Sequence, residues 1–184
     1  VIIDTEEIRD ATNYGVEFFD NGQIRCIGST INFAKKNGKW TYYDTSGNIR
    51  AEKWYKNDKL DGSSTEYYKN GQKSELTHWK DDIMCDEWIE WWENGNKRFE
   101  QNMIGELNED STVPMLAPCG KSLRWHSNGQ LSSEKILDNG LCVGKHIEFD
   151  EYGRKRKEEQ HDKYGCLISW KEWNENGDII DEYN

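Results

Sequence analysis

The sequence lacks a long apolar run and has no excess of basic residues. No stretch approaches the length of a transmembrane helix. The 35 acidic residues outnumber the 24 basic ones, which gives a formal net charge of −11. Without a basic surplus, binding to nucleic acid through phosphate contacts is disfavoured, and so is binding to anionic membrane surfaces. A chain of this charge is instead suited to a protein partner with a basic surface.

Motifs of catalysis and metal binding are also missing. We find no H-E-x-x-H, G-x-S-x-G or phosphate-loop pattern. The four histidines and five cysteines are scattered, and no two cysteines form a C-x-x-C pair. We therefore expect a protein that is not an enzyme and that holds no metal or cofactor. Unpaired cysteines and the lack of a visible signal peptide predict reduced thiols in the cytoplasm.

Against these absences, one phrase recurs seven times, as in YYKNGQKS and WWENGNKR. Each copy is anchored by a turn glycine, and the successive spacings are 25, 24, 24, 34, 24 and 24 residues. A fixed period in this range is typical of repeat proteins, in which each unit packs mainly on its neighbours. The anchors are Gly22, Gly47, Gly71, Gly95, Gly129, Gly153 and Gly177.

The residue four places before each anchor is always aromatic, and the position two places earlier is mostly apolar or Thr. This spacing of two indicates one face of a β-strand. Asn precedes the glycine in five repeats, and Asn-Gly is a strong hairpin signal because both residues tolerate positive φ. We predict that the aromatic column forms the core of the array. Its members are Phe18, Tyr43, Tyr67, Trp91, Trp125, Phe149 and Trp173.

A second turn precedes each strand, as in KNDKLDG, which ends at Gly62, so each unit reads as strand, turn, strand, turn. Seven units predict an all-β fold, an elongated antiparallel meander of about seven 24-residue β-hairpins. We expect an N-terminal cap over residues 1–12 and the repeat array over residues 13–184. The 34-residue step places an inserted loop within residues 102–120, which contain both prolines of the chain, Pro114 and Pro118.

The segment from Gly62 to Gly71 reads G-x-x-x-E-Y-Y-x-N-G and, with its neighbours, resembles the MORN-repeat variant family. The resemblance covers nearly the whole chain and implies a non-enzymatic β-hairpin scaffold. It also implies similarity to bacterial and viral proteins that act as antitoxin components of toxin–antitoxin systems. A role of this kind would place the protein in the cytoplasm of a bacterial or virus-infected cell.

A column of glutamates lies five places before most anchors, on the strand face opposite the invariant aromatics. The same face carries further Trp and Tyr residues, and Trp and Tyr frequently anchor protein interfaces. We predict a partner-binding surface there. The alternative is a purely structural role, in which the face is solvated and its acids pair with nearby Arg and Lys. Apolar residues of the insertion would extend it or pack back on the array. The predicted partner-binding residues are Trp88, Trp92, Tyr68, Glu66, Glu90, Glu148, Met115 and Leu116.

The function that the sequence favours is a protein-binding repeat scaffold, most concretely an antitoxin or immunity-type protein that masks its partner. Two other classes stay open. One is a structural or adaptor subunit of a larger assembly, viral ones included. The other is an acidic nucleic-acid mimic that occupies a DNA-binding protein. A neighbouring toxin gene would favour the first reading, stoichiometric recovery in a large particle the second, and competition with DNA the third.

Overall fold

The computed structural model describes residues 14–32, 34–106 and 115–184 and divides the chain into two compact units, residues 1–83 and 84–184. All secondary structure in the described ranges is β, and none of it is a helix able to cross a membrane. The predicted cap over residues 1–12 lies outside the described residues. The strands are β1 (Tyr14–Phe18), β2 (Ile24–Ile31), β3 (Lys35–Tyr43), β4 (Ile49–Lys56), β5 (Lys59–Tyr67), β6 (Lys73–Lys80), β7 (Ile83–Trp91), β8 (Lys97–Glu106), β9 (Met115–Trp125), β10 (Leu131–Asp138), β11 (Leu141–Phe149), β12 (Lys155–His161), β13 (Leu167–Trp173) and β14 (Ile179–Tyr183).

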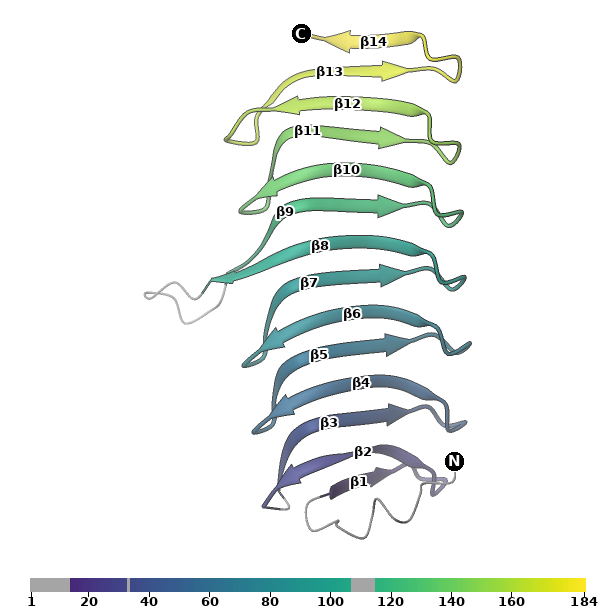
Figure 1. Cartoon of the computed structure of the whole chain (residues 1–184), viewed down its shortest axis with the longest axis vertical. Coiled ribbons are helices and arrows are strands. Elements are labelled where there is room, and N and C mark those ends of the chain that lie inside the picture. The colour runs from purple at the N-terminus through teal and green to yellow at the C-terminus, as the bar shows by residue number, and fades with distance from the viewer. Residues whose placement is uncertain (1–13, 33, 107–114) are drawn as a thin grey trace. The chain divides into compact units, whose positions relative to one another are not determined.

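Within each unit the strands form a meander in chain order (Figure 1). β1 to β6 pair antiparallel in the first unit, and β7 to β14 do so in the second. The predicted all-β meander of hairpin repeats is therefore confirmed. Most repeats carry a register shift beside the aromatic column, for example between Glu66 and Tyr67 and between Glu90 and Trp91. Such a bulge increases the local twist and ends the pairing just before the turn.

The Asn-Gly turns differ from the expectation that both residues adopt positive φ. In the third repeat only Gly71 does, at +83°. Its N–H donates to the carbonyl oxygen of Tyr68, and Asn70 instead uses its side-chain oxygen to accept from the N–H of Gln72. The asparagine is therefore favoured as a hydrogen-bond acceptor in a local turn, while the left-handed geometry falls to the glycine.

Two-residue turns with positive φ at both positions occur at the opposite end of the strands. They are Asn57–Asp58, Asp81–Asp82 and Asn139–Gly140. Asp58 and Asp82 each also form a hydrogen bond to the preceding repeat. Oδ1 of Asp82 accepts from the backbone N–H of Leu60 at 2.7 Å, and Oδ1 of Asp58 accepts from the backbone N–H of Lys36. Asp and Asn suit these sites because they tolerate left-handed geometry better than other residues with a Cβ.

The most deeply buried residues lie mainly on the strand face that carries the glutamates, not in the invariant aromatic column. Trp40 is 3% exposed there, and Ser64, Thr77, Gln101 and Ser122 are equally covered. The aromatic column predicted as core is half-buried from Tyr43 to Trp173, and Phe18 is 62% exposed. The described residues of each unit form only a sheet, so burial on either face comes from side chains of neighbouring strands, and it is deepest where small residues lie beside large ones.

The predicted loop within residues 102–120 is partly strand. β8 and β9 have 10 and 11 residues, and Glu106 pairs with Met115. The insertion therefore lengthens a hairpin, and only residues 107–114, Pro114 among them, lie outside the described residues. Pro118 lies within β9 opposite Met103.

Candidate functional site

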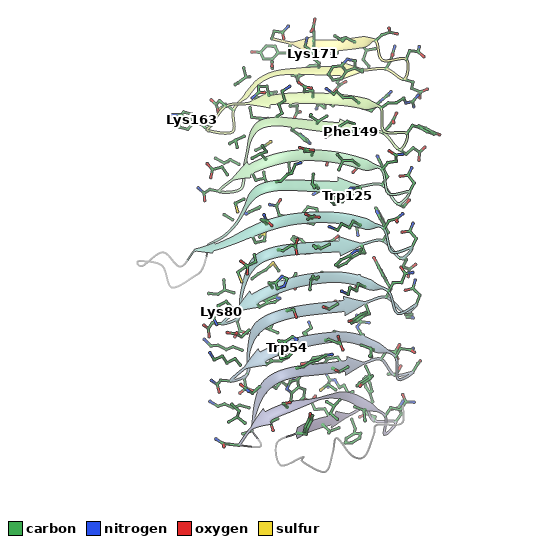
Figure 2. The ribbon with its side chains drawn as sticks, in the orientation of Figure 1. Trp54, Lys80, Trp125, Phe149, Lys163 and Lys171 are labelled. Carbon is green, nitrogen blue, oxygen red and sulfur yellow. The ribbon has the colours of Figure 1, made fainter. Side chains whose placement is uncertain are left out.

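A hollow of about 650 Å³ lies in the second unit, over the ends of β7, β8, β9 and β10 near their turns. Trp125 and Phe149, labelled in Figure 2, mark this end of β9 and β11. The lining combines aromatic rings with two arginines and two glutamates, of which Glu90 is half-buried and Glu151 is exposed. The lining residues are Trp88, Glu90, Trp92, Arg98, Phe99, Arg124, Trp125, His126, Ser127, Asn128, Ser132 and Glu151.

The floor of the hollow is built from Trp88 on β7 and Phe99 on β8. Their ring centroids are 5.0 Å apart and the planes meet at 74°, an edge-to-face arrangement that aromatic pairs favour. The contact follows from the register, because Glu90 lies opposite Phe99 and Trp88 shares a face with Glu90. Alternation along the strands thus brings both rings to one face.

One wall is held together by Trp92 and Arg98. The indole N–H of Trp92 donates to the carbonyl oxygen of Trp125 at 3.1 Å, and the guanidinium of Arg98 lies 4.8 Å from the Trp92 ring centroid. Arg98 also pairs with Glu90 at 3.6 Å. The charges of Arg98 and Glu90 therefore compensate each other within the wall.

The second arginine, Arg124, is placed differently. Its guanidinium lies 5.4 Å from the Phe99 ring centroid, and it forms no ion pair with any residue that the structure describes. The indole Nε1 of Trp88 is buried and has no hydrogen-bond partner among the described residues. The hollow thus contains an uncompensated cation and an unused donor on side chains that both contact Phe99.

The rim is fixed by hydrogen bonds that run from one repeat to the next. The side chains of Asn94 and Asn96 both donate to the carbonyl oxygen of Ser127, at 2.6 and 2.9 Å. Asn128 donates to the carbonyl oxygen of Glu151 at 2.7 Å. These three amide donors are therefore already used, and their bonds hold neighbouring repeats together at the turns.

The structure brings three of the predicted partner-binding residues together, Trp88, Glu90 and Trp92. Tyr68 and Glu66 lie in the first unit, where Glu66 pairs with Lys53 at 3.1 Å. Glu148, on β11, lies 3.5 Å from Nε2 of His146. Met115 and Leu116 begin β9 as part of a strand. Glu66, Glu90 and Glu148 of the glutamate column thus each lie beside a basic side chain.

Phe99 and the cationic role of Arg124 were not predicted. The signal for Phe99 is its place four residues after Gly95, which the strand pairing puts on the face of Glu90. The isolation of Arg124 depends on which acids fold next to it. Sequence spacing alone does not give that information.

An aromatic cluster in the first unit shows the contrasting case. The Nζ atom of Lys36 lies 4.3 Å from the Trp40 ring centroid and 3.1 Å from the hydroxyl of Tyr42, which in turn bonds Tyr55 at 2.8 Å. Burial, together with the bond to Tyr42, raises the pKa of Tyr55. In this cluster one lysine thus contacts several aromatic side chains, whereas in the hollow of the second unit Arg98 and Arg124 each lie on a different ring.

A group of titratable side chains in mutual contact lies on β11 and β12. His146 Nδ1 is 3.0 Å from Glu159, which Lys157 also contacts at 2.8 Å. Burial acts to raise the pKa of Glu159, but the bonds from Lys157 and His146 outweigh it and lower the pKa. Within the described ranges, no three His, Cys, Asp or Glu side chains are grouped so that they could hold a metal ion.

Comparison with known families finds the MORN repeat variant. Its model matches residues 36–57 and 60–81, two consecutive segments that carry β3, β4, β5 and β6. The predicted resemblance is thereby confirmed for these repeats, and MORN repeats are generally non-enzymatic scaffolds. No curated protein matches the chain. The resemblance to antitoxin components receives no support from these comparisons.

Proposed function

We propose that this chain is a repeat scaffold that binds another protein through the hollow of the second unit. The observation that carries the proposal is the grouping of Trp88, Trp92 and Phe99 around Arg98 and Arg124. Trp and Arg are the residue types most enriched where single side chains dominate binding energy. A half-buried aromatic wall with polar groups at the rim is also the usual build of such an interface.

The charge of the two units differs and supports a protein partner with a basic surface. Residues 1–83 contain 14 acidic and 12 basic residues, a net charge of −2. Residues 84–184 contain 21 acidic and 12 basic residues, a net charge of −9. The unit that carries the hollow thus attracts basic proteins over long range, which raises the association rate.

The more specific role, an antitoxin or immunity-type protein that masks its partner in the cytoplasm, rests on the family resemblance. It adds to the scaffold proposal one requirement, that the partner's own activity falls when it is bound. An adaptor would leave that activity unchanged, and a nucleic-acid mimic would compete with DNA for the same partner.

The proposal is tested by quantitative affinity capture from the native host with the intact chain and two variants. Trp92→Ala removes a wall of the hollow, whereas Tyr68→Ala alters the equivalent position, three residues before the anchor glycine, in the first unit. We expect Trp92→Ala to reduce recovery of the partner at least about tenfold, as expected for loss of a binding anchor, and Tyr68→Ala to leave it unchanged. Equal recovery with both variants, each shown to be folded by circular dichroism, would exclude the hollow.

A further inference from the structure

The hollow has a chemical preference that its aromatic walls alone do not specify. Four side chains with a full charge line the hollow, Glu90, Arg98, Arg124 and Glu151. Glu90 and Arg98 compensate each other at 3.6 Å, which leaves Arg124 as the arginine of the lining that has no ion pair with a described residue. Arg124 is exposed, although the surrounding unit is strongly acidic.

A second, independent observation is an unused donor on Trp88, whose ring contacts Phe99 as Arg124 does. Nε1 of Trp88 is buried without a hydrogen-bond partner in the described part of the chain. A buried donor left unpaired costs free energy that a new acceptor would recover. Because this atom is covered in the unbound chain, an acceptor reaches it only after a side chain in the hollow moves. Arg124, being exposed, is free to do so.

We infer that the hollow binds an acidic side chain of the partner protein. Its carboxylate would pair with Arg124 and accept from Trp88, and the adjacent methylene groups would pack on Phe99 and Trp92. An ion pair with a guanidinium is among the stronger hydrogen-bonded contacts available to a carboxylate. This inference rests on the proposed function and names the group that the hollow selects.

The remaining charges of the hollow and its unit define the neighbours of that acidic residue. Glu151, which also lines the hollow, is exposed and forms no ion pair with a described residue. The unit as a whole carries a net charge of −9. A single carboxylate flanked by Lys or Arg fits both Arg124 and the second acidic side chain of the lining, Glu151. A polyanion is disfavoured, because every phosphate beyond the first meets the negative charge of the unit.

The test uses two capped peptides of seven residues, Gly-Lys-Leu-Glu-Leu-Lys-Gly and its counterpart with Gln in place of Glu. Binding to the intact chain, labelled with ¹⁵N, is followed through the indole N–H signals, and Trp88→Phe and Trp92→Phe assign the two of interest. We expect saturable shifts of both signals with the Glu peptide. We also expect binding of the Gln peptide to be weaker by about tenfold, as for loss of one charged hydrogen-bonded pair.

Arg124→Gln should remove the preference for Glu over Gln, and Arg124→Lys should keep part of it. Arg154→Gln is the matched control, because Arg154 also lies on a ring of the second unit, that of Tyr152 at 4.9 Å. Equal shifts from both peptides, no shift from either, or stronger binding of an octathymidylate would each overturn the inference. If the captured partner is lost with Trp92→Ala but kept with Arg124→Gln, the proposed function stands and this inference fails.

Discussion

The indole ring of Trp40 lies directly on Gly28, its cross-strand partner. A Cβ at Gly28 would stand 2.5 Å from Cδ1 of Trp40, closer than any real contact, and the indole N–H donates to the carbonyl oxygen of the next residue, Ser29, at 2.8 Å. Trp40 is the large buried residue of the first unit, and glycine beneath it makes room for the ring. The core of a sheet without a second layer is thus built by pairing one large side chain with small ones on neighbouring strands.

Gly28→Ala should lower the free energy of unfolding by about 2 kcal/mol, because overpacking forces the ring or the backbone to shift. Urea denaturation followed by tryptophan fluorescence measures it. Ser29→Ala, next to it on the same strand, is the control and should change little. In the double variant with Trp40→Leu, most of the cost of Gly28→Ala should disappear, since the two sites are coupled. An additive double variant would show that the clash with the indole is not the cause.

Asp82 contributes both a left-handed turn residue and a link between repeats. Its φ is +69° and its side chain accepts from the N–H of Leu60. Asp82→Ala should cost about 2 kcal/mol, and Asp82→Gly only about 1 kcal/mol, because glycine restores the backbone freedom but not the hydrogen bond. Urea denaturation of the two variants, side by side with the parent chain, gives the comparison. An Ala variant as stable as the Gly variant would contradict the role of the turn geometry.

The ion pairs of Glu158 predict how the stability of the fold changes with pH. Lys155 at 2.6 Å and Lys145 at 3.0 Å hydrogen-bond its carboxylate and lower its pKa from the ordinary 4.5. A carboxyl group whose pKa is lower in the folded state than in the unfolded state stabilises the fold at any pH above its unfolded-state pKa. This contribution is lost as the pH falls through the folded-state pKa. Glu158→Gln should therefore show a smaller loss of stability on acidification below about pH 5 than the parent chain.

Thermal unfolding in a pH series from 7 to 3 measures this difference. Glu175→Gln serves as the control, because Glu175 is exposed and its carboxylate forms no ion pair with a described residue. It should follow the parent chain across the series. Parallel curves for Glu158→Gln and the parent would mean that the two lysines do not stabilise the ionised carboxylate in solution.

The strands and their repeat were predictable because their signals are local. Alternation around Tyr67 and the glycine at position 71 each act within a few residues, and the same pattern returns after 24 residues in four of the six steps. The choice of the more buried face was not predictable, because aromatic residues occur on both faces of strands such as Ile83–Trp91. Small residues such as Ser64 and Thr77 mark the covered face, and their burial depends on large neighbours on adjacent strands.

The candidate site could be predicted only in part. Trp88, Glu90 and Trp92 followed from the column pattern. The hollow itself depends on the bond from Trp92 to Trp125, which joins residues 33 positions apart across the lengthened hairpin. That Arg124 forms no ion pair with a described residue likewise depends on which side chains the fold places around it. Long-range contacts of this kind leave no periodic trace in the sequence.

Site-specific photo-crosslinking in the native host tests most directly whether the hollow contacts a protein. A benzophenone amino acid replaces Ser132, which lines the hollow, in one variant and Arg50, which lies on the first unit, in another. We expect a discrete adduct with one protein from position 132, absent when Trp92→Ala is added, and no such adduct from position 50. Adducts from position 50 alone, or none from either position in folded protein, would contradict the proposal that this chain binds its partner through the hollow.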